Sequence, residues 1–337
     1  MPSTDDAPDA PTDSRSFGTR LQVGWERATR NLPLAFVPLL SSLLAPDNLR
    51  RVRSYEGNYF GLALQLPSSL PDLWTFVSLP NGEPGIHVSP TLWLLPVLVP
   101  LQAALVAGLL GSAHEFTRTG GYDFAANVRR YFVPVLVFVA LVRAVALGTG
   151  ALATAALPVV FLVVPLLLLV LSYVFYATPY LLVVEDASVG EALATSYDWA
   201  TEGGPYLAYA AGYLLVVFAV SAVGSAFVVN LGVLGAAVGA VVSAPLALAL
   251  TFTTVEFVAD MGVGRGAGGD TRPGSGGGGR GAGDGDGSEP DADRSFYRDL
   301  EGESDRDDRW SVEYRDERAA DRDRDEPGTD WNPREGW

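Results

Sequence analysis

Long apolar runs joined by short polar segments constrain this chain more than any other feature of its sequence. A membrane helix needs about 20 apolar residues to cross roughly 30 Å of hydrocarbon. Runs that are apolar on every side do not suit a soluble domain, whose surface helices keep a polar face. Because every backbone group must find a partner inside lipid, we expect helices. The predicted spans lie near residues 32–45, 91–113, 131–150, 152–184, 205–229 and 231–258.

The predicted fold class is therefore all-α, a polytopic membrane bundle of about six transmembrane helices. The first run, 32–45, is the shortest. It can cross only with help from its neighbours or in a thinner bilayer. A re-entrant or interfacial helix over the same residues is the alternative, and it would leave five spans.

Charge and apolar content divide the chain into three zones. Residues 1–15 form an acidic leader, residues 16–261 a membrane domain, and residues 262–337 a glycine-rich linker followed by an Asp/Arg-rich tail. Polar composition with few aliphatic residues predicts disorder at both ends. The tail holds three tryptophans that could anchor a partner protein; the alternative is a tail that only keeps the protein soluble. These tryptophans are Trp310, Trp331 and Trp337.

Composition excludes most catalytic chemistry. The chain has no cysteine and two histidines, His87 and His114, which lie far apart in sequence. Disulfides, thiolate ligands and a histidine-based triad are therefore not expected, and no Gly-Lys-Ser/Thr phosphate loop is present. We predict a protein that is not an enzyme and has no cofactor and no bound metal.

The charge of the chain bears on its solvent and partners. The formal net charge is −16, which disfavours nucleic acid as a partner. Every basic residue is arginine. This acidic, lysine-free composition resembles that of proteins from extremely halophilic archaea.

Arginine placement predicts the orientation in the cell membrane. Arginines concentrate in residues 15–30, before the first run, and in residues 118–130, between the second and third runs. Short arginine-rich segments stay in the cytoplasm, so an even number of spans places both termini there. The arginines within residues 50–53 do not fit this orientation, because it places them outside the cell.

The longest loop between predicted spans covers residues 46–90. It holds two half-apolar pieces, YFGLALQL and LWTFVSL. Aromatic residues favour the membrane boundary, so we expect this loop to lie along the outer interface. A small binding lip outside the membrane is the alternative.

Two polar segments repeat each other. Residues 17–36 align without a gap with residues 189–208, and each copy leads into a pair of spans. Both have the 3.6-residue period of an amphipathic helix, and SVGE at 188–191 offers a capping box. We expect a cytoplasmic surface helix in each copy and a third in the weaker match 121–134. The predicted apolar faces comprise Phe17, Leu21, Trp25 and Ala28 in one copy and Val189, Leu193, Tyr197 and Ala200 in the other.

One stretch carries a family resemblance. In TPYLLVVEDASVGEALATSYDWATEG, residues 178–203, a proline ends a span and is followed by an apolar run, an acid, EAL, a serine and an aromatic residue. This order resembles that of a family of uncharacterised six-span membrane proteins of archaea. It is also similar to the membrane domain fused to some glycerophosphodiester phosphodiesterases. The resemblance covers roughly residues 16–261 and implies a helical membrane fold of unsettled biochemical role.

Arg143 is the residue of this chain that most clearly suggests a functional site, because it lies within an apolar run. It lies in the third run, about twelve residues from its start and thus roughly 18 Å deep by helix rise. Gln102, near the middle of the second run, is the candidate partner. An intramembrane charge is costly and points to function. The alternative is that Arg143 extends to the outer interface or pairs with a lipid phosphate.

Two functions remain compatible with these features. The first is a non-enzymatic membrane scaffold or accessory subunit whose cytoplasmic tail recruits protein partners. The second is a transporter or lipid-binding membrane protein that uses a cavity near Arg143. Membrane lipids are partners in both cases.

Overall fold

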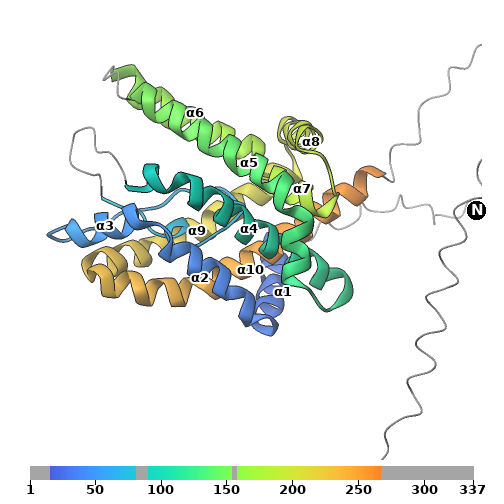
Figure 1. The fold of residues 1–337 in the computed structure, drawn as a ribbon, viewed down its shortest axis with the longest axis horizontal. Coiled ribbons are helices and arrows are strands. Elements are labelled where there is room, and N and C mark those ends of the chain that lie inside the picture. The colour runs from blue at the N-terminus through green and yellow to red at the C-terminus, as the bar shows by residue number, and fades with distance from the viewer. Residues whose placement is uncertain (1–15, 81–89, 154–157, 267–337) are drawn as a thin grey trace, which may run out of the picture. The chain divides into compact units, whose positions relative to one another are not determined.

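The computed structural model describes residues 16–80, 90–153 and 158–266, which are mainly helical and contain no β-strand (Figure 1). The predicted leader 1–15 and the tail tryptophans Trp310, Trp331 and Trp337 lie outside the described residues. In chain order the helices are α1 (Phe17–Arg30), the 3₁₀ helix η1 (Leu32–Ala35), α2 (Phe36–Leu43), α3 (Pro46–Ser54), the 3₁₀ helix η2 (Leu73–Thr75), α4 (Pro90–Thr119), α5 (Phe124–Ala153), α6 (Pro158–Phe175), α7 (Thr178–Val184), α8 (Val189–Glu202), α9 (Pro205–Asn230) and α10 (Gly232–Gly266).

The described residues contain five segments that are long and apolar enough to cross a membrane. They are α4, α5, the consecutive α6 and α7, α9 and α10, and they coincide with five of the predicted runs. The chain is therefore an integral membrane protein of the predicted all-α class. The first predicted run, 32–45, is different, because its helical part, Leu32–Leu43, is followed by a second piece, Pro46–Ser54, at a bend of 63°. This bent pair is a sixth span only if its two pieces are counted as one.

The helices alternate in direction, so the bundle has two distinct ends. α4 ends where α5 begins, and α8 leads into α9, at what we call the α8 end. α9 ends and α10 begins at the opposite end, which also holds α3 and is called the α3 end. Gly232 makes the reversal between α9 and α10 with a φ of +63°, a conformation that glycine adopts without strain.

The fourth predicted run, 152–184, forms two helices. α6 ends at Phe175 and α7 begins at Thr178, because Pro179 has no N–H to donate to the carbonyl of Phe175. α6 exposes leucines such as Leu166, whereas α7 is buried from Thr178 to Val183. Lipid therefore surrounds much of α6, while α7 belongs to the protein core.

The two repeated helices, α1 and α8, bury equivalent positions. Residues 20, 24 and 28 are buried in α1, and the aligned residues 192, 196 and 200 are buried in α8. The prediction of the apolar faces was wrong for one pair of aligned residues, which are exposed and not buried. Trp25 is 45% exposed and Tyr197 is 54% exposed. The prediction of a third, separate surface helix over residues 121–134 was also wrong, because most of these residues form the first turns of α5.

Close approach between helices explains why α1 does not bury Trp25. A Cβ atom on Gly24 would lie only 2.2 Å from Thr253 Oγ1 and 2.6 Å from the carbonyl oxygen of Ala249. The small residues of α1 therefore face α10, and the large aromatic side chain is turned away. α1 is thus packed into the bundle along one face instead of lying on it.

A cluster of tyrosines fills the core towards the α8 end. Tyr176 stacks on Tyr206 with 4.1 Å between ring centroids, and Tyr209 stacks on Phe257 at 4.1 Å. Tyr209 and Thr254 share a hydrogen bond of 2.7 Å between their hydroxyl groups. These contacts tie the connection between α6 and α7 to α9 and α10.

Residues 55–80 form a re-entrant loop, and the predicted course along the outer interface is wrong. Its backbone N–H groups donate to polar side chains spaced along α9. Tyr59 N donates to Asn230 Oδ1 at 2.7 Å, Ser78 N to Ser225 Oγ at 2.8 Å, and Ala63 N to Ser221 Oγ at 2.9 Å. The loop therefore descends beside α9 instead of lying across the end of the bundle.

The depth of this loop follows from the helix that it contacts. Ser221 lies nine residues before Asn230, which is about 14 Å along α9. Further along the loop, the carbonyl oxygen of Ser68 accepts a hydrogen bond of 2.7 Å from Tyr180 Oη. Tyr180 is only four residues before the end of α7. A segment that enters at the α3 end thus reaches the tyrosine cluster near the α8 end.

Candidate functional site

Arg143 lies on α5, six residues before the membrane-spanning part of that helix ends at Thr149. The distance to that end is about 9 Å by helix rise. Arg143 Nη2 donates a hydrogen bond of 2.6 Å to Gln102 Oε1 on α4. The contact between the two predicted residues is therefore present, while the role of this pair as a functional site stays a prediction.

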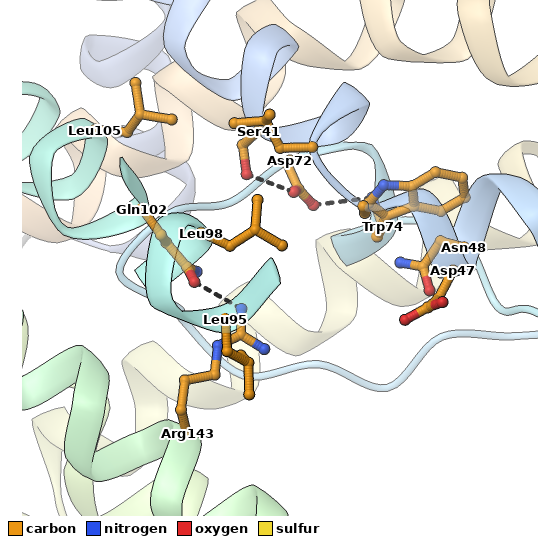
Figure 2. A pocket seen from close by; sticks show the side chains of 12 residues that line it. Ser41, Asp47, Asn48, Asp72, Trp74, Leu95, Leu98, Gln102, Leu105 and Arg143 are labelled. Carbon is orange, nitrogen blue, oxygen red and sulfur yellow. Dashed lines mark hydrogen bonds between the residues drawn. The ribbon is translucent and has the colours of Figure 1, made fainter. Parts of the chain in front are cut away.

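A cavity of about 270 Å³ opens beside this pair, between α2, α3, η2, α4 and α5 (Figure 2). A second cavity, of about 300 Å³, extends between the re-entrant loop and α5. Both are lined by Asp72, Trp74, Gln102 and Arg143, so we treat them as one space, the Arg143 cleft. Its other polar lining residues are Ser41, Asp47, Asn48, Gln65, Ser68, Ser69 and Thr75.

Asp72 is held in the cleft wall by several hydrogen bonds. Its carboxylate accepts hydrogen bonds from Ser41 Oγ at 2.8 Å and from Trp74 N at 3.0 Å, and it caps η2 together with Thr75. Burial raises the pKa of Asp72 from 3.8 to about 6, although these hydrogen bonds favour the charged form. The carboxyl group therefore changes its charge near neutral pH.

Trp74 is fixed beside Asp72 by contacts to α2. Its Nε1 donates to the carbonyl oxygen of Ser42 at 2.8 Å, and Ser42 Oγ accepts from Leu73 N at 3.0 Å. These bonds attach η2 to α2, so the indole ring and the Asp72 carboxylate keep a defined position in the cleft wall.

The two sides of the cleft differ in charge. Arg143 and Gln102 come from α5 and α4, whereas Asp47 and Asn48 come from α3 and Trp74 comes from η2 (Figure 2). Figure 2 shows the first pair on one side of the cavity and the second group on the other. Leucines of α4, including Leu95 and Leu98, also line the cavity. The arrangement can hold a ligand between a cationic side and an acidic, aromatic side.

A second set of charged residues lies near the α8 end and forms ion pairs within the protein. Arg27 pairs with Glu256 at 2.7 Å, and Arg20 pairs with Asp260. Glu256 is only 5% exposed, so this acid is buried within the bundle. These pairs hold α1 against α10. Among the described residues, no group of three or more acidic or histidine side chains is placed to bind a metal ion.

Sequence reasoning found Arg143 and Gln102 but missed Asp72, Trp74 and Asp47. The available signal was local: in PDLWT, residues 71–75, an aspartate precedes a short helical turn, which is a typical N-cap position. Its place beside Arg143 depends on the re-entrant course of the loop. Comparisons with known protein families, curated proteins and solved structures find no match to this chain.

Proposed function

We propose that this membrane protein binds a small polar molecule or a lipid head group in the Arg143 cleft, as a transporter or lipid-binding protein and without catalysing a reaction. The observation that carries the proposal is the position of Arg143. Its guanidinium group reaches Gln102 on the neighbouring helix and lines a polar cleft. An arginine that only extended to the interface would not require such a partner or such a cleft.

The re-entrant loop supports the same proposal. Non-helical backbone is tolerated at membrane depth where it is buried in protein or lines a space that contains water. Ala63 is buried against α9, whereas Gln65 and Ser69 line the cleft opposite α5. We infer that water, and with it a polar ligand, reaches the cleft.

Mass spectrometry of molecules that co-purify with the full chain in mild detergent tests this proposal. We expect a lipid or solute that the unmodified protein retains and the Arg143→Gln variant loses. Arg53→Gln is the matched control, because it removes an exposed arginine from α3 that does not line the cleft. Equal retention by all three proteins would contradict the proposal.

The scaffold function remains a prediction, because it rests on residues 262–337. So do the cell-membrane location, the cytoplasmic termini and the family resemblance. A protein partner that is lost when residues 267–337 are deleted, and kept in Arg143→Gln, is what the scaffold function requires. This deletion leaves α10 intact.

A further inference from the structure

We infer that the Arg143 cleft selects a zwitterion, with a carboxylate or phosphate group at Arg143 and an ammonium group at Trp74, Asp72 and Asp47. This inference rests on the proposed function and specifies its ligand class. The two charged sides of one cleft carry it.

The anionic group belongs beside Arg143. A guanidinium group offers several N–H donors in a plane and suits carboxylate and phosphate oxygens. Gln102 accepts one of those donors through Oε1 at 2.6 Å, which orients the guanidinium group. The amide nitrogen of Gln102 carries further donors for the same anion.

The cationic group belongs on the opposite side. An aromatic ring next to carboxylates is a favourable environment for an ammonium group. Trp74 supplies the ring, and its bond to Ser42 holds the indole in place. Asp72 and Asp47 supply carboxylates, and the described residues that line this side of the cleft include no arginine or histidine.

Ligands with a single charge suit the cleft less well. An anion bound at Arg143 would face Asp72 and Asp47, and a cation at Trp74 would face Arg143. Like charges that face each other across a small cavity repel, which weakens the binding of a ligand with a single charge. A zwitterion meets both sides at once, and the two cavities of the cleft, of about 270 and 300 Å³, admit only a small solute or a head group.

Two sources share this chemistry: a free zwitterionic solute and the head group of an amine-bearing phospholipid. Glycine betaine represents the first, with choline and acetate as probes that carry only one of its charges. Phosphatidylethanolamine represents the second, with phosphatidylglycerol as the anionic lipid for comparison.

The test measures both sources on the full chain. Calorimetry in phosphatidylglycerol nanodiscs gives the affinities for betaine, choline and acetate. Native mass spectrometry gives the retention of each phospholipid. Asp47→Asn is the main variant, with Glu56→Gln as a control for an exposed acid at the same end of the bundle that does not line the cleft. Asp72→Asn is less decisive because Asp72 also caps η2.

We expect betaine to bind at least about tenfold more tightly than choline or acetate, or phosphatidylethanolamine to be retained over phosphatidylglycerol by a similar factor. Asp47→Asn should reduce that preference by about tenfold, the size of one charge-assisted contact, and Glu56→Gln should leave it unchanged.

Retention of anions as strong as that of zwitterions, with no effect of Asp47→Asn, would overturn the inference and leave the proposed function standing. Absence of any ligand that depends on Arg143 would overturn both.

Discussion

Tyr180 Oη donates a 2.7 Å hydrogen bond to the main-chain carbonyl oxygen of Ser68. This bond joins α7, in the core near the α8 end, to a loop that enters from the α3 end. Because Tyr180 is fully buried, the contact fixes the depth of the loop and thereby the position of the cleft wall that follows it.

The re-entrant course can be tested by cysteine labelling, since the chain has no cysteine of its own. Ser69→Cys should react with a membrane-impermeant maleimide from the same side as Arg53→Cys, because Ser69 lines the cleft. Glu202→Cys, at the α8 end, should react from the opposite side. Ser196→Cys is fully buried and serves as the unreactive control. Labelling of Ser69→Cys from the Glu202 side would refute the arrangement.

Removing the hydroxyl of Tyr180 should destabilise the protein. Tyr180→Phe leaves the carbonyl of Ser68 without this donor, at a cost of about 1 kcal/mol. We expect a lower Tm in detergent. Tyr197→Phe, at an exposed position, should leave the Tm unchanged, and an equal Tm for both variants would count against the contact.

Enlarging Gly24 should separate α1 from α10. The added methyl group in Gly24→Ala would meet Thr253 Oγ1 and the backbone oxygen of Ala249, and such overpacking costs about 1–3 kcal/mol. Gly190→Ala in α8 is the control, because its Cβ meets nothing within 4 Å. Thermal unfolding should distinguish the two, and a Tm for Gly24→Ala at or above that of the unmodified protein would contradict the close approach.

Binding of betaine should depend on the charge of Asp72. Because its pKa is raised to about 6, Asp72 is mainly neutral at pH 5 and mainly ionised at pH 7. We expect betaine to bind up to about tenfold more tightly at pH 7. The other ionisable groups facing Asp72 are Asp47 of α3, Arg143 of α5 and Tyr213 of α9. Calorimetry at both values of pH measures the change.

The stability of the empty protein should move in the opposite direction. A carboxyl group whose pKa is raised on folding holds its proton more tightly in the folded state. Its contribution to the free energy of unfolding is therefore largest below pH 3.8 and is lost as pH rises to about 6. Asp72→Asn should abolish this dependence and the pH dependence of binding together, and a variant that kept either one would show that another group titrates.

Apolar content alone was enough to predict most of the helices. The apolar runs that form α4, α9 and α10 are long and uniformly apolar. In lipid, a single segment can pair all its backbone hydrogen-bonding groups only as a helix. The break before α7 lies at Pro179, a residue type that favours a kink or a break in a helix, although proline is also common in uninterrupted membrane helices. The inward face of α1 was missed because close packing at Gly24 outweighed the burial of Trp25.

The cleft could be predicted only in part. Arg143 was conspicuous because it interrupts an apolar run, and Gln102 because amides are rare at the centre of one. The residues on the opposite side lie in a polar, proline-containing loop, whose composition is the same for a surface loop and a buried one. The loop is buried because it bonds to a row of polar side chains on α9, about 150 residues further along the chain. These side chains are Ser221, Ser225 and Asn230.

That separation has a consequence for biosynthesis. The re-entrant loop leaves the ribosome long before α9, so its backbone N–H groups at first have only water as a partner. It can enter the bundle only after α9 has crossed the membrane and supplied Ser221 and Ser225. The wall of the cleft is therefore among the last parts of the molecule to form, and a chain truncated before residue 205 would contain Arg143 and Gln102 without this wall.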